Sequence, residues 1–270
     1  MINKILKLCK SKLFFKGLLS GIAATVEHEI LLKDIQPPNT IIDIGSNKGQ
    51  FLILIEKMFP GRTAYSFEPI KEMMDKQKKF FSFKQNIYFY NYALGSESSL
   101  KNFFITLRKD SSSFLKINEV NNQNKNYNIK ENRPIQINTL DDCFENKNIK
   151  QPILIKIDVQ GYELEVLKGS AKTLNSIDYI YVEVNSGEVY EGCAKIEEID
   201  DFLDKHNFLR VATKFAYDFL PWGDAFYVRR ENLNNTQILR AKIYKYIISK
   251  KYLYKYFIYL RKFYWKLISN

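Results

Sequence analysis

The chain has 270 residues and a hydrophobic content of 46%, which is enough to bury the core of one substantial domain with appendages. Its three cysteines, Cys9, Cys143 and Cys193, are too few and too irregularly spaced for a disulfide framework or a zinc cluster. We therefore expect free thiols and a reducing compartment.

The formal charge of +11 is concentrated at the two ends of the chain. Residues 1–20 contain five lysines and no acid, and residues 231–270 contain nine Lys or Arg and one Glu, which leaves about −2 for residues 21–230. A nucleic-acid partner is therefore not expected, because it requires a broad basic groove across the domain. Lysines interrupt the apolar N-terminal segment, and no run reaches about 18 apolar residues, so neither a signal peptide nor a spanning helix is expected.

Short β-branched or aromatic runs alternate with amphipathic segments along most of the chain. The predicted strands are residues 40–45, 64–68, 87–92, 153–159, 179–184, 208–212 and 225–228. The predicted helices are residues 50–59, 70–81, 162–174 and 196–206. This alternation predicts an α/β fold with a doubly wound sheet, mostly parallel, in which the last two strands form an antiparallel hairpin at one end.

The predicted organisation has three parts. Residues 1–38 form basic and capping helices, residues 39–230 form the central domain, and residues 231–270 form a basic, aromatic, amphipathic helix. Within the central domain, residues 96–138 are a Ser- and Asn-rich polar insertion with short strand-like pieces, "NFFIT" and "PIQIN". We expect a surface loop there, and an ordered lid over a site is the alternative.

The first predicted strand runs into a turn that would suit a nucleoside-containing ligand. In "TIIDIGSNKGQF", Gly45 and Gly49 allow a ligand to approach main-chain N–H groups at the start of the next helix, with Asn47 between them. Glu68 ends the next strand, where a carboxylate can accept the hydroxyl protons of a ribose. Asp43 would repel a pyrophosphate but attract the ammonium and sulfonium of S-adenosylmethionine, which favours a methyl donor over the dinucleotide of an oxidoreductase.

Seven segments in a fixed order carry a resemblance to a known family. They are "IIDIGSNKGQF", "FEP", "YALG", "TLDD", "LIKIDVQGYELEVLKG", "YVEVN" and "GDAFYV", which span roughly residues 21–230. In these segments the chain resembles the FkbM family of S-adenosylmethionine-dependent methyltransferases, although Ser46 stands where the family often has alanine. The resemblance implies a class I methyltransferase (Rossmann-like) sheet, donor binding by the Asp43–Gly49 loop and Glu68, and positions near the adenine for Asn91 and Ala93.

Asp158 ends the fourth predicted strand, where the transferable methyl group should meet its acceptor. There it would line the donor site and orient or deprotonate an acceptor hydroxyl, although it could instead cap the following helix. Glu183 follows the fifth strand, with Asn185 two residues later. Asp158, Glu183 and Asn185 would be the ligands if Mg²⁺ were bound, but we favour a Glu183 that accepts a hydrogen bond from loop backbone, because hard cations need more oxygen ligands.

Two further residues have functional and structural interpretations. His28, in a helix that the resemblance places before the first strand, could act as a general base, since histidine titrates near neutral pH. A structural role is the alternative. Glu163 lies in the first turn of the helix after Gly161, where stabilisation of the helix dipole is a sufficient explanation.

The last 21 residues, "KKYLYKYFIYLRKFYWKLISN", carry an apolar stripe opposite lysines at helical spacing. Such a helix suits either peripheral contact with an anionic membrane or packing on its own domain or another subunit.

The sequence thus predicts a cytoplasmic O-methyltransferase, peripheral to the inner face of the membrane if the tail binds lipid. Its acceptor would be a small molecule or glycan hydroxyl, and the sugar part of this expectation comes from the resemblance alone. The alternatives are a nucleotide-linked oxidoreductase and a non-catalytic membrane- or partner-binding protein of the same fold.

Overall fold

The computed structural model describes residues 8–9, 11–118, 127–215 and 222–249. A central sheet has the strand order β3-β2-β1-β7-β8-β10-β9. These strands are β1 (Thr40–Ile44), β2 (Thr63–Phe67), β3 (Ile87–Tyr90), β7 (Ile153–Ile157), β8 (Tyr179–Asn185), β9 (Phe208–Phe215) and β10 (Trp222–Arg229). β10 is antiparallel to β8 and β9, and the other neighbours pair in parallel. The predicted doubly wound sheet with its terminal hairpin is confirmed.

The centre of the sheet consists of β1 and β7, whose sequences are TIIDI and ILIKI. Every residue of both strands is buried, because the sheet is covered on both faces and such strands read as nearly continuous apolar runs. Asp43 and Lys156 are the two charged residues in these strands, and they are partners in the register of β1 and β7.

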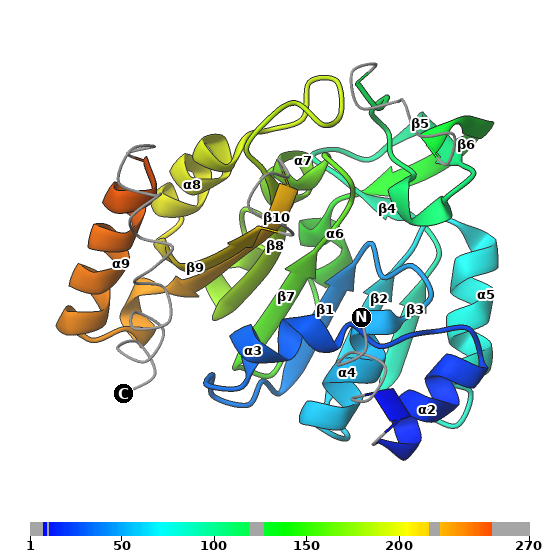
Figure 1. The fold of residues 1–270 in the computed structure, drawn as a ribbon, viewed down its shortest axis with the longest axis horizontal. Helices are drawn as coiled ribbons and strands as arrows, with labels where there is room; N and C mark the ends of the chain where they lie inside the picture. The colour runs from blue at the N-terminus through cyan, green and yellow to red at the C-terminus, as the bar shows by residue number, and fades with distance from the viewer. Residues whose placement is uncertain (1–7, 10, 119–126, 216–221, 250–270) are drawn as a thin grey trace.

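Helices cover both faces of the sheet, with α2, α3 and α4 in front of it in Figure 1. The first hydrophobic core includes side chains from α2 (Lys12–Leu19), α3 (Glu29–Leu32), α4 (Gln50–Met58) and α5 (Lys71–Phe80). The second core, on the opposite face, includes side chains from α6 (Leu140–Phe144), α7 (Glu163–Lys168) and α8 (Ile196–Lys205). The result is a three-layer α/β/α arrangement.

The polar insertion contains an ordered sheet, which differs from the expected surface loop. The insertion contributes β5 (Ser99–Thr106) and β6 (Ile129–Asn138), and β4 (Ala93–Leu94), just before it, completes the sheet in the order β4-β6-β5. Alternate residues such as Phe103, Ile105, Ile135 and Ile137 form a small third core with Tyr162. This period-2 pattern is what holds the insertion as a hairpin beside the main sheet.

The predicted helix over residues 162–174 is wrong in its length. α7 ends at Lys168, and a separate 3-10 turn covers Thr173–Ser176. Gly169 follows α7 directly, and a Cβ atom at this position would lie 1.9 Å from the carbonyl oxygen of Gly95. The close passage of another backbone segment therefore requires glycine where α7 stops.

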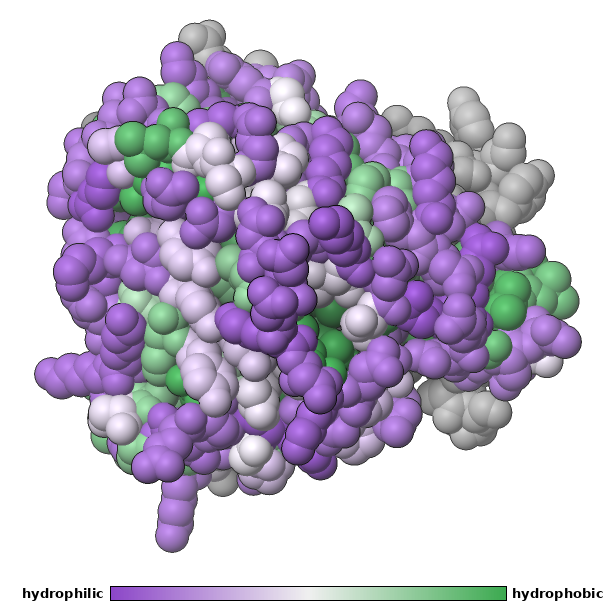
Figure 2. Space-filling model, turned by 180° about the vertical axis from the view of Figure 1, so that it is seen from behind, coloured by the Kyte–Doolittle hydropathy of each residue, from purple (hydrophilic) through white to green (hydrophobic). Residues whose placement is uncertain are grey.

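The last described element, α9 (Asn235–Ser249), packs beside β9 at the edge of the sheet (Figure 1). The predicted amphipathic stripe of residues 250–270 lies outside the described residues. Among the described helices, none combines the length and the apolar composition that a bilayer-spanning segment needs. Figure 2 shows the face opposite to Figure 1, where hydrophilic residues cover most of the surface and hydrophobic ones form small patches.

Candidate active site

A cavity of about 710 Å³ opens at the carboxyl ends of the central strands. Its wall includes residues at the ends of β1, β2, β7 and β8, the start of β10 and the 3-10 turn η1 (Val26–His28). Residues 108–112 of the insertion complete another side. Doubly wound sheets bind their ligands at this edge, so the cavity lies where the sequence placed the site.

The turn after β1 brings backbone into the cavity wall. Gly45, Asn47 and Gly49 have positive φ values of 74°, 51° and 87°. A Cβ atom at Gly45 would lie 1.9 Å from the carbonyl oxygen of Asp158, so only glycine lets this turn pass so close to the end of β7. Gly45 and Asn47 line the cavity, whereas Gly49 begins α4 and faces the side chains of Phe81 and Gln77.

Glu68 lines the same part of the cavity and is held by two backbone amides. Its Oε2 accepts a hydrogen bond from the Asn47 N–H and its Oε1 accepts one from the Ile70 N–H, both at 2.8 Å. The side chain is 5% exposed, and burial raises its pKa to about 7. Each oxygen keeps a further lone pair, so the carboxylate can still accept the two hydroxyl protons of a ribose.

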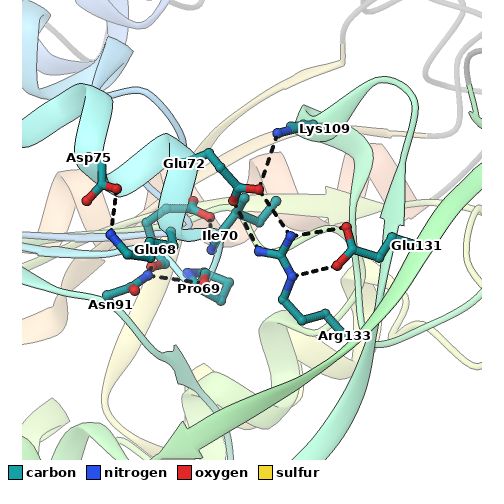
Figure 3. Close-up of polar contacts among 10 residues, drawn as sticks. Glu68, Pro69, Ile70, Glu72, Asp75, Asn91, Lys109, Glu131 and Arg133 are labelled. Carbon is teal, nitrogen blue, oxygen red and sulfur yellow. Dashed lines mark hydrogen bonds and ion pairs between the residues drawn. The ribbon is translucent and has the colours of Figure 1, made fainter.

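The turn that carries Glu68 is supported from outside the cavity, as Figure 3 shows. The amide of Asn91 donates to the carbonyl oxygens of Glu68 at 2.9 Å and Pro69 at 3.1 Å. Asn91 is exposed and ties this turn in place, whereas Ala93 lies in the cavity wall. Of the two residues expected near an adenine, the structure brings Ala93 to the cavity.

A group of charged side chains links the insertion to α5, and Figure 3 shows its arrangement. The guanidinium of Arg133 on β6 donates two hydrogen bonds of 3.1 Å to the Glu72 carboxylate and one of 2.8 Å to Oε1 of Glu131. Lys109 Nζ lies 3.9 Å from Glu72 Oε1. Hydrogen bonds from Arg133 lower the pKa of Glu72 to about 2. We call these four residues the clasp.

Charged side chains form two successive rows on one face of the main sheet. In the first row, Asp43 on β1 pairs in register with Lys156 on β7. Two residues closer to the strand ends, Asp158, Glu183 and Asp224 form the second row, in which Glu183 and Asp224 are register partners. Because alternate residues of a strand share a face, both rows lie on the side covered by α4.

Asp43 lies behind the cavity wall. The residue is 0% exposed, and neither carboxylate oxygen accepts a hydrogen bond shorter than 3.5 Å from the described residues. The ammonium of Lys156 lies 3.6 Å from Asp43 Oδ1. Burial raises the pKa of Asp43 to about 6, and Lys156 opposes that shift. The structure therefore brings Lys156 to the cavity and holds Asp43 beneath it.

Asp158 and Glu183 are joined by a single amide group. Nε2 of Gln160 donates to Oδ1 of Asp158 at 2.9 Å and to Oε2 of Glu183 at 2.8 Å. The Tyr190 hydroxyl donates to Oε1 of Gln160 at 2.6 Å, which fixes the orientation of the amide. Gln160 itself has a positive φ of 58°. Glu183 was expected to accept a hydrogen bond from loop backbone. In the structure it accepts one from the side-chain amide of Gln160.

The position of the Gln160 amide is relevant to the hypothesis that Asp158, Glu183 and Asn185 bind Mg²⁺. The amide hydrogens of Gln160 occupy the space between the two carboxylates, where a divalent cation would need bare oxygens. Asn185 is 2% exposed and also lines the cavity. Within the described part of the chain, no group of three His, Cys, Asp or Glu side chains is placed to hold a metal ion. The residues Asp158, Glu183 and Asn185, as arranged here, do not fit Mg²⁺.

The acids of the second row differ in their protonation. Burial alone would raise the pKa of Asp158, but Lys156 and Gln160 hold it below its ordinary value. Burial and the nearby Asp158 raise the pKa of Glu183 well above its ordinary range. The same two causes raise the pKa of Asp224 to about 7. The row therefore contains one firmly ionised carboxylate beside two that hold protons more readily.

His28 lines the same cavity as these acids and is 8% exposed. Its ring centroid is 4.8 Å from that of Tyr181 and 6.1 Å from that of Phe51. Burial, together with the positive charge of Lys156, lowers the pKa of His28 to about 4. The imidazole is consequently neutral at pH 7, and its low pKa makes it a weak proton acceptor.

Glu163 has a local role that the sequence did not predict. Its Oε1 accepts hydrogen bonds from the N–H groups of Val159 at 3.1 Å and Gly161 at 3.0 Å. The side chain is 1% exposed, and burial raises its pKa to about 7. Glu163 thus fixes the loop that carries Gln160.

Several cavity residues were missed by the sequence analysis: Lys156, Gln160, Tyr190, Lys214, Trp222 and Asp224. Lys156 had a readable signal, because a lysine in the middle of the apolar strand ILIKI must be buried and therefore paired. Asp224 had a weaker one in its position on the last strand. Tyr190 follows β8 in an irregular loop, and no periodic pattern pointed to it.

The strand order and the cavity at the carboxyl ends of the strands define an α/β protein with the class I methyltransferase fold. The chain belongs to the methyltransferase FkbM domain family, whose profile matches residues 43–210. This membership confirms the resemblance found in the sequence.

Individual relatives are more distant. The 2-O-methyltransferase NoeI of Sinorhizobium fredii is 23% identical over 198 residues, which cover 70% of this chain and 82% of that protein. The hexuronic acid methyltransferase AglP of Haloferax volcanii is 40% identical over 47 residues, 17% of this chain and 20% of that protein. Among solved structures, TrmK of M. capricolum in complex with S-adenosylhomocysteine is 11% identical with a TM-score of 0.45, covering 80% of this chain and 74% of that one.

Proposed function

We propose that this protein is an S-adenosylmethionine-dependent O-methyltransferase that acts on a hydroxyl group of a sugar, a glycan precursor or a similar small metabolite. The observation that carries the proposal is the composition of the cavity. Glu68 stands on a turn suited to a ribose, and Asp158 and His28 line the same cavity. Membership of the FkbM family supplies the reaction class.

In the proposed reaction, bound S-adenosylmethionine supplies an electrophilic methyl group. Glu68 holds the ribose, and the backbone of Gly45 and Asn47 allows close approach of the donor. Asp158 orients the acceptor hydroxyl. The oxygen of the acceptor would form the new C–O bond as the C–S bond breaks and S-adenosylhomocysteine leaves, and the hydroxyl proton would pass to Asp158 or to the neutral imidazole of His28.

The sugar part of the proposal has separate support. The names of NoeI and AglP describe an O-directed methyltransferase and a methyltransferase acting on hexuronic acid. In this chain, Asn185 and the acids of the second row offer hydrogen-bond acceptors, and Trp222 lines the cavity beside them. Hydroxyl groups can donate to such oxygens while a sugar ring packs on the indole.

Calorimetric titration distinguishes the proposed enzyme from an oxidoreductase. We expect S-adenosylhomocysteine to bind and NADH to show no binding at the same protein concentration. Labelled S-adenosylmethionine is then incubated with hexoses, hexosamines and hexuronates, and methylated products are identified by mass spectrometry. Binding of NADH without binding of S-adenosylhomocysteine would contradict the proposal.

Membrane contact or self-association through residues 250–270 stays a proposal that rests on the sequence, and so does a cytoplasmic location. Flotation of the full chain and of a chain ending at Arg230 with anionic liposomes tests the contact, because equal flotation of both would remove the tail from it. The non-catalytic alternative predicts that function survives Asp43→Ala but not this truncation.

A further inference from the structure

Lys156 is a buried cation between two acids. Lys156 is 5% exposed, and its ammonium lies 3.2 Å from Asp158 Oδ2 and 3.6 Å from Asp43 Oδ1. The ammonium also lies 5.8 Å from the centroid of the Phe51 ring on α4. A buried lysine without such partners would strongly destabilise the fold, so the two acids and the ring account for its presence in β7.

The two acids differ in their access to the cavity. The side chain of Asp158 is 36% exposed and lines the cavity, whereas that of Asp43 is 0% exposed. Lys156 therefore has one partner that can meet a ligand and one that cannot.

Both oxygens of Asp158 are held by protein groups. Lys156 contacts Oδ2, and the Gln160 amide donates to Oδ1. A carboxylate held at both oxygens has a fixed plane, and its remaining lone pairs point in set directions. An acceptor hydroxyl that donates to Asp158 would then be oriented by the residues behind it.

We propose that Lys156 is a positioning residue for methyl transfer, which fixes the Asp158 carboxylate at the acceptor side of the cavity. Asp43 serves as the buried counter-ion of Lys156 and is not a contact of the donor. This inference rests on the proposed methyl transfer, but its test includes measurements that need no acceptor.

The first measurement is the affinity for S-adenosylhomocysteine, which keeps the α-ammonium of the donor. We expect Asp43→Asn to leave the dissociation constant within about threefold of the wild-type value, because Asp43 acts through Lys156. If Asp43→Asn weakens binding tenfold or more while Lys156→Met leaves it unchanged, Asp43 binds the donor directly and its assignment is overturned.

The second measurement is the titration of the Asp158 carboxyl carbon by NMR. Asp158 faces Lys156 and Gln160 on its own segment, Glu183 on β8 and His28 on η1. Lys156→Met removes the nearest positive charge, so the pKa of Asp158 should rise by about one unit or more. An unchanged titration would overturn the role of Lys156.

The third measurement is the turnover number with an acceptor found for the wild-type enzyme. Lys156→Met and Asp43→Asn should each lower kcat about tenfold or more, and Lys156→Arg should retain more of it than Lys156→Met. The double variant Asp43→Asn/Lys156→Met should have the same kcat as Lys156→Met alone, since either change removes the ion pair between Asp43 and Lys156. If the two losses in kcat multiply in the double variant, Asp43 and Lys156 do not act as one pair.

Matched controls separate these effects from general loss of stability. Glu56 and Lys84 form a half-buried ion pair outside the cavity wall, so Glu56→Gln and Lys84→Met make the same kinds of change elsewhere. Urea unfolding of every variant identifies those that fail to fold, and Lys156→Arg and Asp43→Asn then serve in place of Lys156→Met. If the wild-type chain binds S-adenosylhomocysteine but methylates no hydroxyl, the proposed function fails, while the first two measurements still decide the inference.

Discussion

Glu68 combines complete burial with two backbone hydrogen bonds and a raised pKa of about 7. In its ionised form the carboxylate can accept two ribose hydroxyl protons, but the protonated form has lost one of these acceptor positions. The ligand therefore competes with a proton near neutral pH. A residue that looks like a simple hydrogen-bond acceptor becomes sensitive to pH because of where it is buried.

We expect the affinity for S-adenosylhomocysteine to increase as pH rises from 6 to 8, by about threefold to tenfold. The sign follows from preferential binding to the ionised carboxylate, whose population grows until pH exceeds the pKa of about 7. Calorimetry at three pH values measures the effect. In Glu68→Gln the affinity should be lower and independent of pH over this range, and an unchanged pH dependence would assign the effect to another group. Glu145→Gln, at an exposed residue outside the cavity wall, is the matched control.

Gln160 shows how one neutral side chain can set the character of a site. Its amide lies between Asp158 and Glu183 and is oriented by the Tyr190 hydroxyl. Two carboxylates that contact the same amide nitrogen would repel each other or attract a cation if the amide were absent. The amide helps to keep Asp158 ionised, whereas burial and the negative charge of Asp158 make Glu183 hold its proton more firmly.

At the scale of elements, the clasp joins the insertion to the helix that follows Glu68. Arg133 on β6 makes a forked contact with Glu72 on α5, and a second contact with Glu131 on its own strand. Exposed ion pairs contribute little to global stability, but a network can hold two elements in one arrangement. Through Lys109, the clasp thereby connects residues 108–112 of the cavity wall to α5.

We expect Arg133→Ala to speed amide hydrogen exchange in β5 and β6 and to weaken S-adenosylhomocysteine binding by about twofold to fivefold. The midpoint of global unfolding should change little. Hydrogen exchange followed by mass spectrometry and calorimetry measure the two effects. Lys71→Ala is the control, because the Lys71–Asp75 ion pair is exposed and lies within α5. Equal exchange in both variants would mean that the clasp does not restrain the hairpin.

Elements with strong local patterns could be predicted from the sequence, and those shaped by distant contacts could not. β1 and β7 are continuous apolar runs, and the burial of both strands follows from that composition. The end of α7 at Lys168 depends on the passage of Gly95 against Gly169, which no local pattern contains. The hairpin of the insertion was obscured by the long polar stretch between its strands, although both strand-like pieces were visible.

The same distinction applies to the site. Asp158 and Glu183 were predicted because each lies at the carboxyl end of a strand, and these ends meet at one edge of the sheet. The relation of Asp43 to Lys156 depends on the register of two parallel strands far apart in sequence. The resemblance implied a position near the adenine for Asn91, but its amide turns to the carbonyl oxygens of Glu68 and Pro69.

At the scale of the whole molecule, buried acids make stability depend on pH in an unusual direction. Burial raises the pKa values of Glu68, Glu163 and Asp224 to about 7. The folded chain therefore keeps protons that the unfolded chain has lost between about pH 4.5 and pH 7, so these groups lower stability as pH rises through that window. His28 has the opposite effect, since its folded pKa of about 4 lies below its ordinary 6.5, and its contribution is lost as pH falls through 6.5 toward 4.

We expect the free energy of unfolding to be larger at pH 6 than at pH 8, by roughly 2 kcal/mol. Each of the three acids contributes about 1 kcal/mol in this direction, and His28 removes somewhat less than one such contribution. Urea unfolding followed by tryptophan fluorescence at both pH values measures the difference. Glu163→Gln should reduce it, because that variant lacks one of the three acids, and greater stability at pH 8 would contradict the expectation.

The two rows of charged residues lie on β7 and its neighbouring strands, so the hydrogen-bonded sheet sets the distance between the rows. Lys156 and Asp158 share a face only because one residue separates them along the strand. Insertion or deletion of a single residue within β7 would turn both side chains into the opposite layer, among the apolar residues of α6 and α7. The spacing between the Asp43–Lys156 ion pair and the Asp158 carboxylate is thus set by the pleat of the backbone, which a change of residue type leaves intact and a change of chain length does not.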